Sequence, residues 1–265
     1  MELELKNKSV IVTGGGSNIG RAITLGFARE GAKITVADID TNQADAVAQE
    51  ARSLGAAAVD VVSCDVTDLE QVKAAFQHAV DAHGGVDVLV NNVGWDDLMF
   101  FTQTTPDLWQ KLININFVGN LNCTSEALRV MIPNNRGAIV SLSSDASRQG
   151  EPREAVYGAL KAGVNSFMKT VAKENGRYGI RCNAVCPGVT IPEQSEEVGD
   201  SSMWKNMDSM FTAEQLEKVA KALPLKKLGR PQDIANAVLF LSSDAVAGHV
   251  TGQILSVSGG YSMIG

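Results

Sequence analysis

The amino-acid sequence predicts a doubly wound α/β fold, in which a parallel seven-stranded sheet carries helices on both faces. Three observations lead to this prediction. Short runs of apolar, β-branched residues alternate with longer helical patterns along most of the chain. A cluster of glycines follows the first apolar run, where a strand would turn into a helix. The length of 265 residues suits one α/β domain spanning 1–265.

Seven runs are predicted as strands. Most of them are continuously apolar rather than alternating, which is expected when both faces of a parallel sheet are covered. Their ranges are 9–13, 33–38, 58–64, 86–91, 137–143, 180–185 and 254–257.

Helical patterns lie between these runs. Thr41, Thr67 and Pro231 occupy positions that suit helix starts. The expected helices are near 19–30, 41–54, 68–83, 106–131, 155–177 and 231–243.

The segment 190–223 breaks the alternation, because it contains no strand pattern. A long insertion that follows the carboxyl end of a strand is typical of a substrate lid. An amphipathic helix packed on the body is the alternative. The apolar residues expected to cover a substrate are Met203, Trp204, Met207, Met210 and Phe211, and the acidic run Glu193, Glu196, Glu197 and Asp200 precedes them.

The composition argues against several kinds of partner. The net charge is −7 and there is no block of Lys or Arg, so neither nucleic acid nor an anionic membrane is expected as a partner. No apolar run reaches the roughly 18 residues of a membrane span, and no signal peptide is recognised. The four cysteines and three histidines show no metal-ligand spacing, so no metal is expected. This cysteine usage suits the cytoplasm.

The glycine cluster predicts a phosphate-binding turn. Thr13 is followed by Gly-Gly-Gly-Ser-Asn-Ile-Gly, and the backbone of Gly14, Ser17, Asn18 and Ile19 is expected to approach a pyrophosphate at a helix N-terminus. A tight strand-to-helix turn is the alternative. Asp38 ends the second strand, where a carboxylate can accept both ribose hydroxyls of NAD and repel the extra phosphate of NADP. The two features together favour NAD.

Tyr157 and Lys161 form a candidate catalytic pair. They are four residues apart in a helical pattern and therefore share one face. A free phenol has a pKa of about 10 and is a poor base, but a nearby ammonium lowers the pKa of the phenol. Tyr157 could then remove the proton of an alcohol while a hydride leaves for nicotinamide.

With these motifs the chain resembles the short-chain dehydrogenase/reductase family, which has a Rossmann-type fold, over nearly its whole length. The resemblance rests on several motifs in the expected order. They are the glycine loop with Asp38, Cys64-Asp65-Val66, Asn91-Asn92-Val93-Gly94, Asn116, Ser144, Tyr157 with Lys161, Pro187-Gly188 and Ser258-Gly259-Gly260.

The resemblance implies a role for each matching residue. Tyr157 would be the general acid/base, Lys161 would lower its pKa and hold the nicotinamide ribose, and Ser144 would hydrogen-bond the substrate oxygen. Asn116 would kink its helix and hold a water, and Thr13 would tie the loop to the fourth strand. The residues that would border the cofactor are Asp65, Val66, Asn91, Gly94, Pro187, Gly188, Val189 and Thr190.

Three positions depart from the family pattern. Asn18 replaces a glycine, and asparagine tolerates the left-handed conformation that the turn requires. Pro192 stands where the family often has a threonine near the nicotinamide, so Thr190 is the candidate replacement. Ser258 replaces a frequent aspartate.

Within the family, the chain most resembles dehydrogenases of cyclic hydroxyacyl-CoA esters, such as 2-hydroxycyclohexanecarboxyl-CoA dehydrogenase. The pieces it shares are Asn91 to Asp96, Ser144-Asp145-Ala146, Glu154 to Tyr157 and Val257 to Gly260. The expected reaction is NAD-linked oxidation of a secondary alcohol β to a thioester, and Arg148 and Arg153 are candidate contacts for CoA phosphates.

Three other functions are alternatives. One is a small cyclic or aromatic alcohol as substrate, without CoA. Another is reduction of a 3-oxoacyl group on an acyl-carrier protein. Such reductases resemble NADP users with a basic surface, so Asp38 and the net charge argue against that function. The third is a non-enzymatic nucleotide sensor, but such a protein would not require Asn116, Ser144, Tyr157 and Lys161 together.

A homotetramer is expected, because the helical segments 107–131 and 155–177 are apolar around much of their circumference.

Overall fold

Seven parallel strands form the centre of the molecule. The computed structural model describes residues 2–192, 197–199, 202, 205 and 212–264. The order in the sheet is β3-β2-β1-β4-β5-β6-β7, and every pairing is parallel. This confirms the predicted doubly wound sheet. The strands are β1 (Ser9–Thr13), β2 (Lys33–Asp38), β3 (Ala58–Ser63), β4 (Val88–Asn91), β5 (Gly137–Leu142), β6 (Ile180–Pro187) and β7 (Ile254–Val257).

Burial explains the apolar runs. Every residue of β1, β4, β5 and β6 is buried, because these strands have neighbours on both sides and helices on both faces. The edge strand β3 is only partly buried and accordingly carries Asp60 among its valines. The strand ends differ from prediction by at most two residues, as at β4, which begins at Val88, and at β6, which continues to Pro187.

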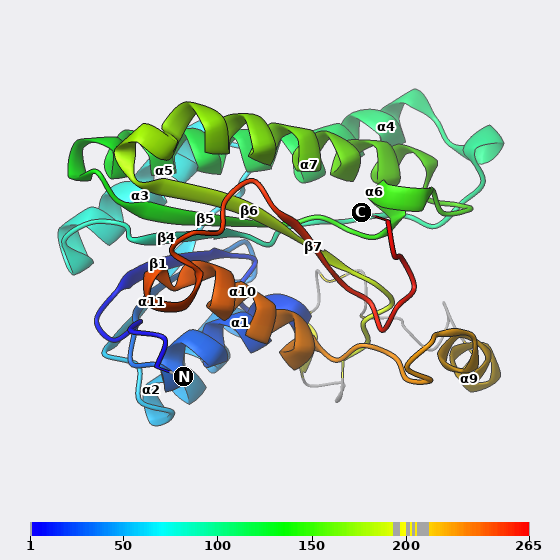
Figure 1. The fold of residues 1–265 in the computed structure, drawn as a ribbon, viewed down its shortest axis with the longest axis horizontal. Helices are drawn as coiled ribbons and strands as arrows, with labels where there is room; N and C mark the ends of the chain where they lie inside the picture. The colour runs from blue at the N-terminus through cyan, green and yellow to red at the C-terminus, as the bar shows by residue number, and fades with distance from the viewer. Residues whose placement is uncertain (1, 193–196, 200–201, 203–204, 206–211, 265) are drawn as a thin grey trace.

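Two layers of helices cover the sheet (Figure 1). One layer packs on a core centred on Phe27, Ile34 and Val238. It contains α1 (Asn18–Arg29), α2 (Thr41–Ser53), α10 (Pro231–Ser242) and α11 (Asp244–Ala247). The other packs on a core centred on Phe76 and Met168. It contains α3 (Leu69–His83), α4 (Pro106–Ile113), α5 (Gly119–Asn134), α6 (Ala146–Gln149) and α7 (Ala155–Asn175).

Helix starts are fixed by capping side chains. Asp40 and Asp68 accept the capping hydrogen bonds of α2 and α3, so the predicted starts at Thr41 and Thr67 lie next to the true N-caps. Pro231 is the first residue of α10, as predicted. Thr212 and Gln215 form a capping box for α9 (Ala213–Ala222), a helix within the segment 190–223, for which an amphipathic helix was the alternative to a lid.

A π turn separates α4 from α5. Residues Asn114–Val118 form this turn, labelled η2, and Asn116 is buried at its centre. A π turn adds one residue to a helical turn and often occurs at functional sites. The helix predicted near 106–131 is therefore divided at Asn116 by this π turn.

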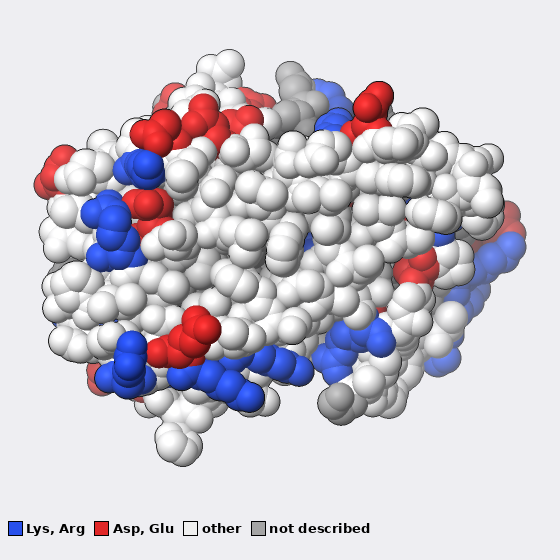
Figure 2. All heavy atoms as spheres, turned by 90° about the horizontal axis from the view of Figure 1, so that it is seen from above, with Lys and Arg blue, Asp and Glu red and all other residues white. Residues whose placement is uncertain are grey.

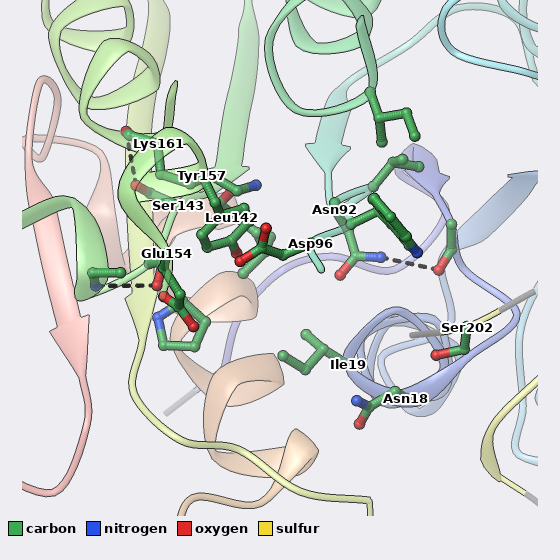
Figure 3. Close-up of a pocket in the computed structure, with 18 of the residues that line it drawn as sticks. Asn18, Ile19, Asn92, Asp96, Leu142, Ser143, Glu154, Tyr157, Lys161 and Ser202 are labelled. Atoms are coloured by element: carbon green, nitrogen blue, oxygen red, sulfur yellow. Dashed lines mark hydrogen bonds between the residues drawn. The ribbon is translucent and has the colours of Figure 1, made fainter. Parts of the chain in front are cut away.

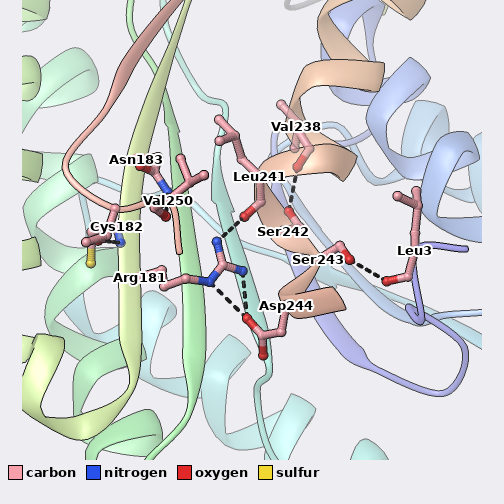
Figure 4. Close-up of polar contacts among 11 residues, drawn as sticks. Leu3, Arg181, Cys182, Asn183, Val238, Leu241, Ser242, Ser243, Asp244 and Val250 are labelled. Atoms are coloured by element: carbon pink, nitrogen blue, oxygen red, sulfur yellow. Dashed lines mark hydrogen bonds and ion pairs between the residues drawn. The ribbon is translucent and has the colours of Figure 1, made fainter. Parts of the chain in front are cut away.

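A small polar network joins strand β6 to the residues at the end of α10 and to the N-terminal segment (Figure 4). The guanidinium of Arg181, on β6, donates to Asp244 Oδ1 at 2.7 and 2.9 Å and to the Leu241 carbonyl at 2.7 Å. Ser243 Oγ donates to the Leu3 carbonyl at 2.6 Å. The network joins β6, α10, α11 and the N-terminal segment on the side of the sheet that carries α1.

None of the helices in the described ranges combines the length and apolar character that a membrane crossing requires. In the same part of the chain, no three His, Cys, Asp or Glu side chains are grouped as a metal site. All four cysteines are buried and free.

Candidate active site

A large pocket lies at the carboxyl ends of the strands (Figure 3). It opens where the strand order reverses between β1 and β4, which is where doubly wound sheets bind ligands. Its volume is about 1230 Å³, more than the several hundred Å³ typical of a site for one small ligand. The pocket therefore has room for a dinucleotide and a substrate together.

The glycine loop forms one end of the pocket with its backbone. Gly14 has a φ of +62°, and Asn18 adopts a φ of +46°, the left-handed conformation expected of the residue that replaces glycine. A Cβ on Gly20 would lie 1.9 Å from the Gly14 carbonyl oxygen, so only glycine fits there. The backbone of the loop is thus closely packed and continues directly into α1. The N-terminus of a helix favours an anionic group.

Thr13 holds this loop against the end of β4, as expected. Its hydroxyl donates to the Val90 carbonyl at 3.3 Å and accepts from the Asn92 amide at 3.0 Å. The Asn92 side chain donates to the carbonyls of Thr13 and Gly14 at 3.0 and 2.9 Å. The second asparagine of the pair therefore shapes the pocket wall.

Asp38 lies at the end of β2 beside the glycine loop. Its carboxylate accepts from the amides of Gly16 and Asp40 at 2.9 and 3.0 Å. Burial raises the pKa of Asp38, and these backbone hydrogen bonds act in the opposite direction. Each carboxylate oxygen keeps a further lone pair, so Asp38 can still accept from ribose hydroxyls.

Tyr157 and Lys161 lie on one face of α7 at the other end of the pocket. The Lys161 ammonium is buried, lies 5.5 Å from the centre of the Tyr157 ring and donates to the Leu142 carbonyl at 2.9 Å. Burial lowers the pKa of Lys161 to about 8. The lysine is thus held by the sheet and faces the ring of the tyrosine.

The expected lowering of the Tyr157 pKa by Lys161 is not observed. Burial raises the pKa of the phenol, and the carboxylates of Glu154 and Asp96 raise it further. A hydrogen bond with Ser144 acts in the opposite direction. Lys161 does not offset the burial, because its ammonium is directed to Leu142 and not to the phenol oxygen.

Ser144 follows β5 and contacts the same space. Its hydroxyl oxygen accepts from the Ala146 amide at 3.1 Å, which fixes the side chain at the start of α6. Together with the hydrogen bond to Tyr157 noted above, this places two hydroxyls where one substrate oxygen could contact both.

Asn116 lies behind this group and fixes the loop that follows β4. Its amide group accepts from the Trp95 amide at 3.1 Å and donates to the Trp95 carbonyl at 2.7 Å. It also donates to the Leu112 carbonyl at 3.1 Å. A Cβ on Gly94 would lie 3.1 Å from Lys161 Nζ and 3.2 Å from Asn116 Oδ1, so these three residues converge.

Most of the predicted site residues line the pocket. Asn91 and Asn116 do not line it. The Asn91 side chain is buried and donates to the Thr124 and Ser141 hydroxyls at 3.0 and 3.2 Å. The place in the pocket lining that was predicted for Asn91 is therefore held by Asn92. The predicted residues that do line the pocket are Gly14, Ser17, Asn18, Ile19, Asp38, Asp65, Val66, Gly94, Ser144, Tyr157, Lys161, Pro187, Gly188, Val189 and Thr190.

The predicted lid is described only in part. Met203, Trp204, Met207, Met210 and Phe211 lie outside the described residues, as do Glu193, Glu196 and Asp200. Among the described residues of this segment, Thr190, Ser202 and Val219 line the pocket. The amide of Gly199 donates to Ser17 Oγ at 3.1 Å, so the segment contacts the glycine loop. Closure over a substrate stays a prediction.

Several pocket residues were missed or undervalued by sequence reasoning. Tyr261 lines the pocket from the C-terminal segment, and its hydroxyl donates to the Glu151 carboxylate. Asp96 and Glu154 face the same end. The available signals were the position of Asp96 just after the Asn-Asn-Val-Gly motif and of Glu154 one turn before Tyr157.

The two candidate CoA-binding arginines are already engaged with backbone. Arg148 donates to the Ile254 carbonyl at 3.1 Å, and Arg153 donates to the Leu98 carbonyl at 2.6 Å. Arg153 lines the mouth of the pocket, and Arg148 does not line it.

Comparison with known proteins gives consistent matches along the chain. A family profile described as enoyl-(acyl carrier protein) reductase matches residues 14–262. A 3-oxoacyl-(acyl-carrier-protein) reductase of Thermotoga maritima is 34% identical over 97% of this chain and 99% of its own. The corresponding reductase of Staphylococcus aureus is 35% identical over 97% and 98%. An acetoacetyl-CoA reductase of Synechocystis is 33% identical over 98% and 99%.

These relatives correct the expected substrate. Their names fit the alternative of a 3-oxoacyl reductase better than the expected resemblance to cyclic hydroxyacyl-CoA dehydrogenases. The expected subgroup rested on short segments such as Trp95-Asp96, whereas the matches extend over nearly the whole chain.

Proposed function

The chain belongs to the short-chain dehydrogenase/reductase family of oxidoreductases, and on that premise we propose that it interconverts 3-hydroxyacyl and 3-oxoacyl thioesters with NAD as the cofactor. The observation that carries the proposal is the placement of Tyr157, Ser144 and Lys161 together in a pocket large enough for both ligands. The names of full-length relatives, which refer to acyl-carrier-protein and CoA substrates, support the thioester.

The reaction requires three tasks from this chain. The hydroxyls of Tyr157 and Ser144 hold the substrate oxygen, and Tyr157 removes or returns its proton. Lys161, held by the Leu142 carbonyl, would hold the ribose of the cofactor. Asn116 keeps the backbone at Trp95 in place behind them. Bound at the glycine loop, NAD would supply the hydride acceptor. The positive charge of its oxidised ring would also offset the carboxylates beside Tyr157.

The glycine loop and Asp38 support NAD as the cofactor. The close approach of the Gly14 and Gly20 backbones fits a pyrophosphate, and the Asp38 carboxylate fits the adenine-side ribose. We also propose a cytoplasmic location, which the four buried, free cysteines support.

The thioester is tested by comparing a substrate with and without its carrier. We expect 3-hydroxybutyryl-CoA to be oxidised with a kcat/KM at least about 100-fold above that of free 3-hydroxybutyrate. Remote contacts to the carrier position the alcohol, so the free acid should lose kcat as well as affinity. NADH formation at equal concentrations measures both. Equal kcat/KM values would instead support the small cyclic or aromatic alcohol without CoA. The same assay with an acyl-carrier-protein thioester separates the two carriers.

We also propose a homotetramer built on the outer faces of α5 and α7. Val156, Leu160 and Phe167 form a half-buried apolar stripe along α7, and Phe117 of the π turn contacts Phe167 edge-on. Figure 2 views this side of the molecule and shows uncharged surface across its middle, with charges toward its edges. A second copy of the chain would cover this surface.

The assembly is checked by light scattering. We expect a particle of four 28.1 kDa chains at micromolar concentration, and Phe167→Glu should shift it to smaller species. The reason is that a carboxylate in a buried apolar contact costs several kcal/mol. Glu174→Gln, at an exposed position on the same helix, is the control. A monomer for the unmodified protein would contradict the proposal.

A further inference from the structure

Two carboxyl groups face the substrate end of the pocket beside Tyr157. Asp96 comes from the loop after β4, and Glu154 immediately precedes α7. Figure 3 shows both side chains pointing into the space next to Tyr157. Both line the pocket, and the charge of each raises the pKa of the Tyr157 phenol. The reaction described above does not use either of them.

Asp96 has an unused hydrogen-bonding atom. The residue is 7% exposed, and its Oδ2 has no hydrogen-bond partner among the described residues. Its carboxylate receives a hydrogen bond from the Asp97 amide. Buried polar atoms almost always have a partner, and a carboxylate left without one is costly. Asp96 lines the pocket, and a proton on its carboxyl lowers the cost of burying Oδ2 without a partner.

The two groups retain protons near neutral pH. Burial and the charge of Asp97 raise the pKa of Asp96 to about 6. Burial and the carboxylates of Asp96 and Glu151 raise the pKa of Glu154 to about 7. Glu154 therefore stays protonated to a higher pH than an ordinary glutamate, and a protonated carboxyl is a hydrogen-bond donor.

The surrounding charged groups do not neutralise this pair. From α7, the Lys161 ammonium is directed to the Leu142 carbonyl. From the pocket mouth, Arg153 donates to the Leu98 carbonyl, and from α4 the Lys111 ammonium lies 3.5 Å from the centre of the Trp95 ring. From the C-terminal segment, the neutral Tyr261 hydroxyl contacts Glu151.

We propose that Asp96 and Glu154 hold a shared proton and donate a hydrogen bond to the carbonyl oxygen of the thioester. The inference rests on the proposed function. The C3 oxygen is held by Tyr157 and Ser144, so the thioester carbonyl, two carbons away, needs a separate donor. Two carboxyls with one proton supply that donor, whereas two carboxylates would repel the carbonyl oxygen. The pair thus selects substrates with a carbonyl at this position.

The test compares two CoA compounds that differ in one group. Acetoacetyl-CoA has the thioester carbonyl, and S-(3-oxobutyl)-CoA has a methylene in its place but keeps the ketone and the carrier. Reduction of both is followed with NADH from about pH 6 to about pH 8, which spans the two raised pKa values. The ratio of the two kcat/KM values cancels the titration of Tyr157, because Tyr157 acts on the ketone of both compounds.

In the unmodified enzyme, the kcat/KM of acetoacetyl-CoA divided by that of S-(3-oxobutyl)-CoA should fall about tenfold as the pH rises. The reason is that the carboxyl pair loses its proton and the thioester carbonyl is left without a hydrogen-bond donor. The Asp96→Asn/Glu154→Gln double variant keeps amide donors at every pH, so its ratio should change by less than about twofold. Glu154→Leu should show the low ratio throughout. Glu174→Gln, exposed on α7, should match the unmodified enzyme.

Two results would overturn the inference alone. One is turnover with a ratio that is constant or rises with pH in the unmodified enzyme, since carboxylates that accept from the substrate would strengthen with pH. The other is the same fall in the double-amide variant. Failure of the unmodified enzyme to reduce either compound would overturn the proposed function and this inference with it.

Discussion

Tyr157→Phe is expected to lower kcat by about 100-fold or more while leaving NADH binding within about threefold of the unmodified protein. The phenol oxygen carries the proton that the alcohol loses, and phenylalanine has no group that can take its place. The phenyl ring keeps the packing against the Lys161 side chain, 5.5 Å from its centre, so the cofactor end of the pocket should be unchanged. Steady-state kinetics and a fluorescence titration with NADH measure the two quantities.

Two further variants make this result specific. Lys161→Ala should weaken both turnover and cofactor binding, because the lysine contacts the tyrosine ring and would hold the ribose. Tyr178→Phe removes a hydroxyl from a tyrosine outside the pocket and should leave both unchanged. If Tyr157→Phe retains more than about a tenth of the rate, another group is the acid/base.

The enzyme is expected to prefer NAD to NADP by at least about 100-fold in kcat/KM. The Asp38 carboxylate lines the pocket beside the glycine loop, where it would repel a ribose phosphate and accept from a ribose hydroxyl. Asp38→Ala should narrow the difference in kcat/KM between the two cofactors. Most of the change should come from weaker NAD binding, because the ribose hydrogen bonds are lost, and a smaller part from the lost repulsion of the NADP phosphate.

Asp40→Asn is the matched control for the loss of one negative charge. Asp40 caps α2 and does not line the pocket, and asparagine preserves the cap. This variant should keep the cofactor preference. A preference of the unmodified protein for NADP would show that Asp38 does not select the cofactor.

The sheet was predictable because its strands are buried on both faces. Continuous apolar runs such as Val10–Val12 are buried, and most of the strands are followed by a turn and a helical pattern. The exact ends were less predictable, since Cys186 and Pro187 extend β6 only because β7 pairs with them. The bounds of α9 were not predicted because none of its residues is buried, although its capping box was visible in the sequence.

The site was predictable where one motif supplies neighbouring groups. The positions of Tyr157 and Lys161 follow from helical spacing, and the turn at Asn18 follows from the glycine loop. The raised pKa of Tyr157 did not follow, because it depends on burial and on carboxylates from two separate loops. Tyr261 also could not be placed, since only the folded C-terminal segment brings it to Glu151.

The π turn at Asn114–Val118 restricts how this part of the chain can change in length. The turn holds one residue more than an α-helical turn, so deleting one residue within it would restore a regular helix and leave the faces of α4 and α5 nearly in place, but would remove the bulged backbone that carries Asn116. A deletion elsewhere in α4 or α5 would rotate the residues that follow by about 100° and turn outward side chains toward the core. Insertions and deletions between Pro106 and Asn134 should therefore be far less tolerated than those in surface loops, even where each replaced side chain is itself exposed.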